Sequence, residues 1–374
     1  MDKVQIISIV DYDNYGNRLQ NYAITKILET KNFDVASDIL IYSKKDWTIN
    51  SNNFFKGLIK KIIPFDYWKN HSKLKLIISN NELRANNFKE FIKLYNVNNI
   101  TINYIKNSKN LKNIINDERI SYYIVGSDQV WNPNFYNHEL SLLKFCDDKK
   151  KIALAPSIGF SKLSENYKKE LKEWLPKFKC LSCREEQGSQ MIREITGREC
   201  TTLIDPTLML SSDEWDKVSK KPVFHNENDK YILLYFLGEM TKEYKDIINN
   251  ISKRYNLKVI DIYDKNSKYY TCGPSEFIYM IKHCSIMLTD SFHGSVFSYI
   301  YNKPFRIFKR IDSIQSMNSR LENLINVLHL SNDIYINMDT FDIEHVLDDP
   351  IYDKTILDKE QKKFKDYLDK AFKE

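Results

Sequence analysis

The sequence contains little cysteine and no long run of apolar residues. Only six of its 374 residues are cysteines, and Cys180 and Cys183 form its one CxxC pair. No second CxxC or Cys/His pair could complete a set of four zinc ligands. The pair lies in a segment typical of a buried strand, where the two side chains should point to opposite faces. We therefore expect core cysteines rather than a zinc or redox site.

The absence of apolar runs also bears on where the protein resides. No stretch approaches the roughly 18 apolar residues that span a bilayer. The opening MDKVQIISIV has no small-residue cleavage site of the kind that ends a signal peptide. We expect a cytoplasmic protein. The Lys- and aromatic-containing segment 56–70 indicates contact with the inner face of the membrane or, because Pro64 interrupts it, a plain surface helix and loop.

Several catalytic motifs are missing as well. The chain has no GxSxG nucleophile elbow, no HExxH or comparable metal pair, and its seven histidines are scattered. The turn after the first expected strand carries one glycine, which excludes a dinucleotide fingerprint and a P-loop. We therefore expect no metal site and none of these enzyme classes.

The charge balance is nearly even. Net charge is +6, from 56 basic and 50 acidic residues. This mild excess is compatible with anionic substrates and is weak support for nucleic-acid binding. No arginine-rich arm or basic-aromatic array stands out, so we expect no nucleic-acid partner.

What the chain does contain is a regular alternation of apolar and amphipathic segments. Val4–Val10 is rich in β-branched residues, as expected of a strand buried on both faces. A helical pattern follows, and the alternation repeats along most of the chain, which favours a parallel sheet. The expected strands cover 4–10, 35–42, 122–127, 151–157, 178–183, 200–205, 231–238, 257–263, 285–290 and 304–309. Residues 44–116 do not fit this pattern.

This alternation predicts an α/β protein with two Rossmann-like, doubly wound domains that face a cleft. The polar segment 212–230, broken by Pro222, is the best candidate for a linker. We therefore expect an N-terminal domain over 1–211, a linker over 212–230, a C-terminal domain over 231–335 and a charged helical tail over 336–374.

Two polar turns follow expected strands, at the sheet edge where ligands of such folds bind. In NYGNRLQ, Gly16 allows close backbone approach, and the helix start between Asn14 and Gln20 offers N–H groups to an anion. A plain strand-to-helix turn is the alternative. In VGSDQVWNP, residues Asp128, Gln129 and Trp131 suit sugar binding, but they can equally cap a helix and pack the domain.

Arg184 lies at a further strand end, beside a helix start. A guanidinium there makes forked hydrogen bonds to carboxylate or phosphate. A surface ion pair with Glu185, Glu186 or Asp205 is the alternative. Asp205 itself precedes a proline, and we favour a structural role for it in a cap or turn.

The C-terminal half offers one histidine in a position suited to chemistry. In TDSFHG, His293 lies at the tip of a strand-to-helix turn, flanked by Ser291 and Gly294. A histidine there can act as general acid or base near neutral pH, or donate a hydrogen bond to a substrate oxygen. Asp290 is the candidate for orienting the ring. Since a lone histidine is usually structural, a packing role is the alternative.

These motifs occur in an order that resembles the polysaccharide pyruvyl transferase family. The set comprises NYGNRLQNYA, VGSDQVWNP, ALAPSIGFS, SCREEQG, IDPTLML, YFLG and Gly273–Phe305, and the resemblance covers roughly residues 4–308. It implies a two-domain fold similar to that of the B-type glycosyltransferases. It also implies transfer of pyruvate from phosphoenolpyruvate to a sugar of a cell-surface polysaccharide, or of its lipid-linked precursor, as a cyclic ketal. No cofactor is implied beyond phosphoenolpyruvate as the donor substrate.

The resemblance also implies roles for individual residues. His293 matches the family's active-site histidine, with Asp290 as its candidate partner, and Arg184 matches an arginine implicated in donor binding. We expect donor contacts from Arg184, Ser291, Gly294 and Glu276, and acceptor or anion contacts from Asn14, Gly16, Gln20, Asp128, Gln129 and Trp131. The N-terminal domain is expected on the acceptor side and the C-terminal domain on the donor side. Ser291 and Phe292 precede His293 where family members often have a basic residue.

Two alternatives use the same scaffold. A glycosyltransferase with a nucleotide-sugar donor could use Glu276 to hold a ribose hydroxyl, as acidic residues do in nucleotide sites. A carbohydrate-binding or scaffold protein of the same pathway would need neither His293 nor Arg184 for its function.

Overall fold

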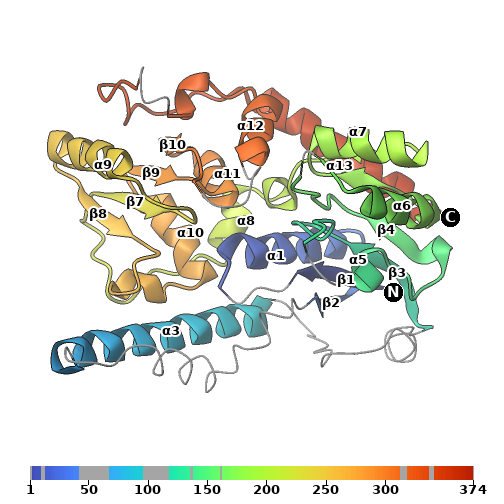
Figure 1. The fold of residues 1–374 in the computed structure, drawn as a ribbon, viewed down its shortest axis with the longest axis horizontal. Helices are drawn as coiled ribbons and strands as arrows, with labels where there is room; N and C mark the ends of the chain where they lie inside the picture. The colour runs from blue at the N-terminus through green and yellow to red at the C-terminus, as the bar shows by residue number, and fades with distance from the viewer. Residues whose placement is uncertain are drawn as a thin grey trace.

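The computed structural model describes residues 2–9, 13–41, 67–95, 118–134, 138–160, 162–311, 318–336 and 341–373. These residues form two four-stranded parallel sheets and a short two-stranded one, with helices between successive strands (Figure 1). The α/β prediction is therefore confirmed. Each of the ten expected strands overlaps a strand of the structure, although most of the observed strands are shorter.

The first sheet has the order β2-β1-β3-β4. Its strands are β1 (Lys3–Ile9), β2 (Asp34–Ile41), β3 (Ile120–Val125) and β4 (Lys151–Ala153). A bridge between Ile152 and Cys180 extends it toward the parallel pair β5 (Ser182–Cys183) and β6 (Thr201–Thr202). The five central residues of β1 are all buried, Gln5 and Ser8 among them, as expected of a strand covered on both faces.

The second sheet has the order β10-β9-β7-β8 and is also parallel. Its strands are β7 (Tyr231–Tyr235), β8 (Lys258–Asp261), β9 (Ile286–Thr289) and β10 (Phe305–Ile307). The longer helices are α1 (Tyr15–Glu29), α3 (Tyr67–Tyr95), α6 (Glu165–Trp174), α7 (Glu186–Thr196), α9 (Lys242–Tyr255), α10 (Pro274–His283), α11 (Phe292–Ile300), α12 (Asn318–Val327) and α13 (Lys354–Phe372). Shorter helices are α5 (His138–Ser141) and α8 (Ser212–Asp216), with 3-10 turns at Asp148–Lys150, Leu175–Lys177, Pro206–Met209, Lys268–Thr271 and Asn332–Ile334.

The two sheets share one hydrophobic core. A single cluster of buried residues runs from Val4 and Leu19 of the first half to Phe277 and Phe297 of the second. At its centre the Tyr15 ring of α1 stacks on the Phe277 ring of α10, with centroids 4.3 Å apart and ring planes 6° apart. The domain boundaries at 211 and 230 stay a prediction, because the packing is continuous across them.

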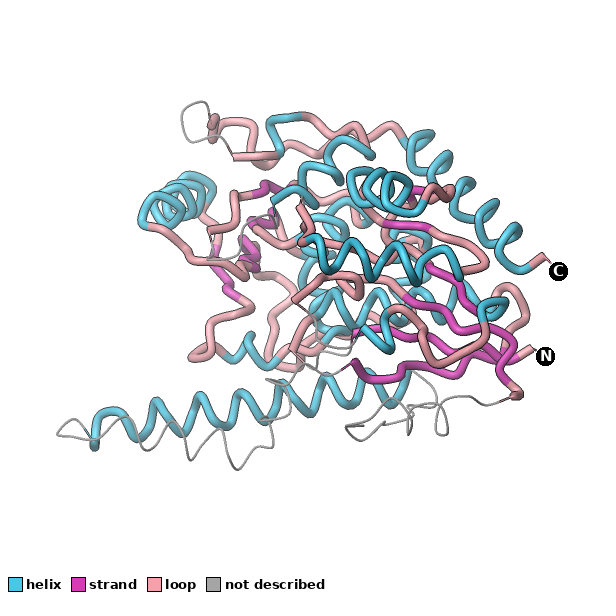
Figure 2. Tube along the Cα trace, turned by 45° about the vertical axis from the view of Figure 1, so that its right-hand side comes forward, coloured by secondary structure: helices cyan, strands magenta, loops and turns pink. Residues whose placement is uncertain are grey.

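Helix α3 lies along the lower side of the molecule in Figures 1 and 2, below the second half, and its C-terminal part contacts α1 through Phe91 and Tyr22. Its Arg84 is buried and donates hydrogen bonds to the hydroxyl of Tyr15 and to the carbonyls of Tyr270 and Cys272. It also pairs with the carboxylate of Asp13, just before α1. A buried guanidinium held by both halves ties the start of α1 to the second half.

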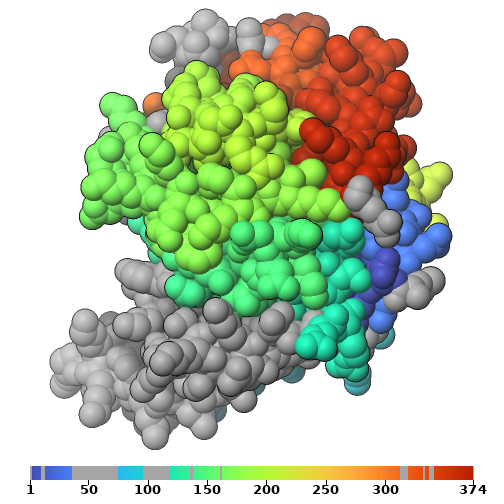
Figure 3. Space-filling model, turned by 90° about the vertical axis from the view of Figure 1, so that its right-hand side faces the viewer, coloured from blue at the N-terminus to red at the C-terminus, as the bar shows by residue number. Residues whose placement is uncertain are grey.

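Two segments expected to lie outside the domains pack against them. In the predicted linker, Trp215 of α8 is buried and donates its Nε1 hydrogen to the carbonyl of Thr207. In the predicted tail, Tyr367 of α13 is buried and donates to the carbonyl of Ala153 at the end of β4. Figure 3 shows this C-terminal segment against the first half of the chain.

The prediction that the two cysteines of the CxxC pair lie in the core is confirmed. Cys180 and Cys183 are both buried and belong to different core clusters, as expected of side chains on opposite faces of a strand. Among the described residues no helix is long and apolar enough to cross a bilayer. Residues 56–66 of the segment for which membrane contact was considered lie outside the described residues.

Candidate functional site

The N-termini of α1 and α11 meet between the two sheets. Each helix is capped by a side chain: Asn14 accepts the N–H of Asn17, and Ser291 accepts that of Gly294. Gly16, in the first turn of α1, faces the His293 ring of α11. A Cβ atom at position 16 would lie 1.9 Å from Nδ1 of His293, so only glycine lets the two helix ends approach this closely.

His293 lies beside Asp205, which comes from the other half of the molecule. The ring is 7% exposed, and its Nε2 is 3.6 Å from Oδ2 of Asp205, longer than a hydrogen bond. Among the residues that the structure describes, this Nε2 has no hydrogen-bond partner. The Oδ1 atom of Asp205 accepts the N–H and hydroxyl of Thr207. Asp205 therefore caps a turn with one oxygen and faces the histidine with the other.

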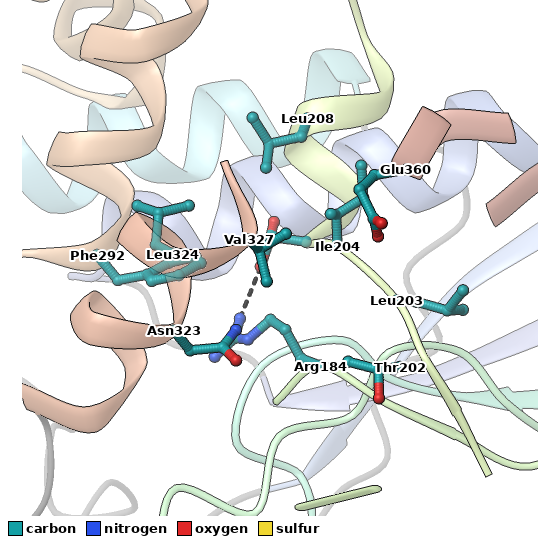
Figure 4. Close-up of a pocket in the computed structure, with 11 residues that line it drawn as sticks. Arg184, Thr202, Leu203, Ile204, Leu208, Phe292, Asn323, Leu324, Val327 and Glu360 are labelled. Carbon is teal, nitrogen blue, oxygen red and sulfur yellow. Dashed lines mark hydrogen bonds and ion pairs between the residues drawn. The ribbon is translucent and has the colours of Figure 1, made fainter. Parts of the chain in front are cut away.

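Arg184 shares the same carboxylate oxygen. Its Nη1 donates to Oδ2 of Asp205 at 2.6 Å, and its guanidinium lies 4.7 Å from the centre of the Phe292 ring. The side chain is 3% exposed, and its Nη2 has no hydrogen-bond partner in the described part of the chain. Figure 4 shows this guanidinium beside Asn323 of α12, with the ion pair to Asp205 drawn as a dashed line. A buried donor without an acceptor is rare and marks a position for a ligand or water.

Asp128 is a second carboxylate of the cluster. It follows β3 with a φ of 61°, and its Oδ2 accepts a hydrogen bond of 3.1 Å from Nδ2 of Asn17 in α1. Its Oδ1 lies 3.9 Å from Nη2 of Arg184 and 3.8 Å from Nη1 of Arg320 in α12. Burial would raise the pKa of Asp128, but the charges of Arg184, His293 and Arg320 lower it below its ordinary value.

The charged side chains of the cluster stabilise one another in their ionised forms. Burial alone would lower the pKa of Arg184, but the carboxylates of Asp205, Glu185 and Asp128 raise it above its ordinary value. Burial would likewise raise the pKa of Asp205, and the adjacent His293 and Arg184 lower it far below its ordinary value. Arg184 and Asp205 are therefore a charged pair at neutral pH.

Two other residues expected at the site, Asp290 and Gly294, contact the second sheet and the loop after β7. Asp290 accepts the N–H groups of Leu237 and Gly238 at 2.8 and 2.7 Å and lies 3.4 Å from Nε of Arg310, so it fixes the loop after β7. The carboxylate beside His293 is that of Asp205. Gly294 faces β9, where an added Cβ would lie 2.8 Å from Oγ1 of Thr289.

Three more residues that were expected to contact a ligand make hydrogen bonds to other parts of the protein. Gln20 joins β1 to the turn after β3, donating to Oγ of Ser8 and accepting the N–H of Ser127. Gln129 accepts from Nδ2 of Asn132. Trp131 is fully buried and donates its Nε1 hydrogen to the carbonyl of Ser141, which supports the packing alternative. Its indole face is not placed to contact a sugar.

Glu276 lies at the start of α10, away from His293. Its carboxylate accepts the N–H of Gly273 at 3.0 Å and lies 3.7 Å from Nζ of Lys220. It thus completes one arm of a capping box for its own helix. Of the expected donor residues, the structure brings Arg184 together with His293, the residue expected to be catalytic, and leaves Glu276 elsewhere.

A small cavity opens beside Arg184. Its walls come from the turns after β5 and β6 and from α11, α12 and α13 (Figure 4). The space within it is about 20 Å³, enough for about one water molecule. A larger ligand therefore requires lining side chains, those of α12 among them, to move outward. Within the described ranges, no cluster of three or more His, Cys, Asp or Glu side chains could hold a metal ion.

The Asp205→Asn variant should show a stability defect that depends on pH. Near pH 7 the variant should unfold more easily, because it leaves the buried Arg184 guanidinium uncompensated. The depressed pKa means that the wild-type carboxylate stabilises the fold above its unfolded pKa of about 3.9 and loses that contribution as pH falls through and below this value. The difference between the unfolding midpoints of the two proteins should therefore be constant from about pH 7 to about pH 5 and should begin to narrow as pH falls below about 3.9 toward pH 3. A difference that stays constant down to about pH 3 would contradict the assignment.

Comparisons with known proteins agree with this fold. The family model described as polysaccharide pyruvyl transferase matches residues 14–312. The S. aureus MnaA–UDP co-structure superposes with a TM-score of 0.50 at 10% identity, covering 99% of this chain and 97% of that one. A glycosyltransferase from Rickettsia africae gives a TM-score of 0.46 at 11% identity, covering 98% and 99%. No curated protein matches the sequence. The fold is thus α/β and similar to that of B-type glycosyltransferases, as expected.

Proposed function

The chain belongs to the polysaccharide pyruvyl transferase family, and from this membership we propose that it transfers pyruvate from phosphoenolpyruvate to a sugar of a cell-surface polysaccharide or its lipid-linked precursor. The observation that carries the proposal is the pair of buried nitrogen atoms, Nη2 of Arg184 and Nε2 of His293. Neither has a hydrogen-bond partner in the described residues, and they come from opposite halves of the molecule. A guanidinium and an imidazole that converge in this way suit a small anionic ligand.

The proposed reaction forms two C–O bonds and breaks one. The two sugar hydroxyl oxygens bond to the enol carbon of phosphoenolpyruvate, and phosphate departs with the bridging oxygen. One hydroxyl proton ends on the methylene carbon, which becomes the methyl group, and the other ends on phosphate. The product is a cyclic ketal.

His293 and Arg184 supply what this reaction needs. Nε2 of His293 is the group that carries a proton between hydroxyl and methylene, a role worth about 10²- to 10⁴-fold in rate. Arg184 holds an anionic group of the donor in forked hydrogen bonds. Oδ2 of Asp205 lies 2.6 Å from Nη1 of Arg184 and 3.6 Å from Nε2 of His293. Its negative charge therefore holds the two side chains next to each other.

A nucleotide-sugar donor is less well supported. The S. aureus protein of similar fold was solved with UDP, but at 10% identity this likeness concerns the fold alone. Glu276, the residue considered for a ribose contact, caps its own helix and pairs with Lys220. The proposal therefore retains phosphoenolpyruvate as the donor.

The test is incubation with phosphoenolpyruvate and a panel of synthetic and lipid-linked glycans. We expect phosphate release that depends on the acceptor, with a product heavier by pyruvate less water. A parallel thermal-shift screen with nucleotides and nucleotide sugars tests the alternative, since a ligand that binds only the folded state raises the unfolding midpoint. Stabilisation by nucleotides and none by phosphoenolpyruvate, with no transfer across the panel, would reject the proposed donor.

A further inference from the structure

A group of lysines lines an open hollow at the edge of the first sheet where its strands begin. The hollow measures about 960 Å³, far more than the cavity beside Arg184, and Figure 3 looks onto this side of the molecule. Its walls are residues at or just before the starts of β1, β3, β4 and β5, together with the end of α6. The lysines among them are Lys149, Lys150, Lys172, Lys177 and Lys179.

These lysines outnumber the carboxylates of the hollow. Three carboxylates line it, those of Asp2, Asp148 and Glu173. Asp148 is paired with a sixth lysine, Lys151, whose Nζ is 2.7 Å away, and Asp2 accepts the hydroxyl hydrogen of Ser121. In the described part of the chain, neither Asp2 nor Glu173 forms an ion pair with a lysine. The hollow therefore keeps an excess of positive charge.

Three of the ammonium groups are free for a partner outside the protein. The side chains of Lys149, Lys150 and Lys172 make no hydrogen bond or ion pair with the residues that the structure describes. Lys149 and Lys172 are exposed, and Lys150 is partly so. Clustered exposed cations create a positive potential over the surface, which attracts anionic partners.

The segment 176–179 holds the other two lysines next to an indole. Nζ of Lys177 lies 3.6 Å from the centre of the half-buried Trp174 ring, and Nζ of Lys179 donates to a backbone carbonyl at the end of α13 at 2.6 Å. Arg198 donates to three backbone carbonyls of this segment. The rim of the hollow is therefore fixed, and its aromatic ring lies beside the lysines.

The hollow and the candidate functional site lie at opposite edges of the first sheet. The lining lysines come at the starts of strands, whereas Gly16, Asp128 and Arg184 follow the ends of β1, β3 and β5. A large partner that covers the hollow therefore leaves the candidate site uncovered.

We propose that the hollow and its rim are a docking surface for an anionic lipid bilayer. The lysines favour this partner, because flexible ammonium groups attract a diffuse layer of lipid head groups, whereas ordered phosphate and nucleic-acid sites use the fork of arginine. No arginine is among the described residues that line the hollow. The indole of Trp174 suits the head-group level of a bilayer, where tryptophan is enriched. The inference does not depend on the donor proposed above.

Sedimentation of the full chain with lipid vesicles tests the proposal. We expect binding to vesicles of phosphatidylcholine mixed with phosphatidylglycerol, and none to phosphatidylcholine alone. Raising the salt from about 0.1 M to about 1 M should release the protein, since the screening length falls from about 10 to about 3 Å. Lys149→Gln/Lys150→Gln/Lys172→Gln should bind the anionic vesicles about 100-fold more weakly, at about fivefold for each basic side chain.

The matched control is Lys242→Gln/Lys245→Gln/Lys253→Gln on α9. It removes the same charge from exposed side chains of the second half and should bind like the wild type. An equal loss in both triple variants would assign the binding to net charge alone and overturn the docking surface. Unchanged binding in the first triple variant would place the membrane contact elsewhere on the chain and likewise overturn it.

Further readouts separate this inference from the proposed function and from another partner. Both triple variants should unfold at the wild-type temperature and transfer pyruvate to a soluble synthetic acceptor at the wild-type rate, because neither set of lysines touches the candidate site. Failure of the wild-type protein to bind anionic vesicles overturns the inference and leaves the proposed donor standing. Tighter binding to duplex DNA than to anionic vesicles, lost in the first triple variant, would assign the surface to nucleic acid and overturn the inference.

Discussion

Replacement of His293 by alanine is expected to lower the rate of pyruvyl transfer about 10²- to 10⁴-fold, the usual contribution of a positioned acid or base. The ring is buried at the junction of the two halves, and its Nε2 has no hydrogen-bond partner among the described residues. The group is thus available to a substrate rather than committed to the fold. Turnover at saturating donor and acceptor is the measurement.

A second substitution distinguishes proton transfer from hydrogen bonding. His293→Gln retains an N–H donor but cannot carry a proton, so it should be as slow as His293→Ala if the ring is the acid or base. Near-complete activity in His293→Gln would instead assign a hydrogen-bonding role. The control is His345→Ala, which removes an exposed histidine side chain that lies against Asp348. Wild-type turnover in His293→Ala itself would contradict any role in the chemistry.

Gly16→Ala is expected to reduce both activity and stability through the same histidine. The added Cβ would lie 1.9 Å from Nδ1 and 2.2 Å from Cγ of His293, so the ring or one helix end must move. Overpacking of this kind costs about 1–3 kcal/mol. A shift of the ring by even about 1 Å can reduce rate about 10²-fold. Unfolding free energy and turnover of the variant are the two measurements.

The double variant Gly16→Ala/His293→Ala provides the control. Removing the ring removes the group that the new Cβ meets, so the double variant should be more stable than the sum of the two single changes predicts. Additive losses would show that Gly16 and His293 do not contact each other, and the proposed junction of α1 and α11 would then be wrong.

Sequence patterns predicted the sheets well because the central strands β7 and β9 are buried along their whole length and are correspondingly rich in apolar residues. They also identified His293, Arg184 and Gly16, since each follows a strand at the sheet edge where α/β folds bind ligands. The long helix α3 was not predicted. Its buried face contacts both halves at once, and Arg84, a charged residue, lies at the centre of that face.

The remaining site residues depend on tertiary contacts that local patterns do not contain. Asp205 was interpreted as a turn residue, and it does cap a turn, but its second oxygen faces Arg184 and His293. Its position directly after a strand end was the available signal. Arg320 had no such signal, because only the packing of α12 over α7 brings it to Phe292. Trp131 shows the converse, a residue with a ligand-like pattern that packs the core.

The central claim is that one small-anion site lies where Arg184 and His293 converge from the two halves. A crystal structure of the protein with phosphoenolpyruvate tests it most directly. The account predicts the ligand between the two halves, with an anionic group on Nη2 of Arg184, the enol carbons within reach of Nε2 of His293, and α12 displaced outward from the small cavity. Phosphoenolpyruvate bound elsewhere, with Nη2 of Arg184 and Nε2 of His293 left without contact to it, would contradict the account.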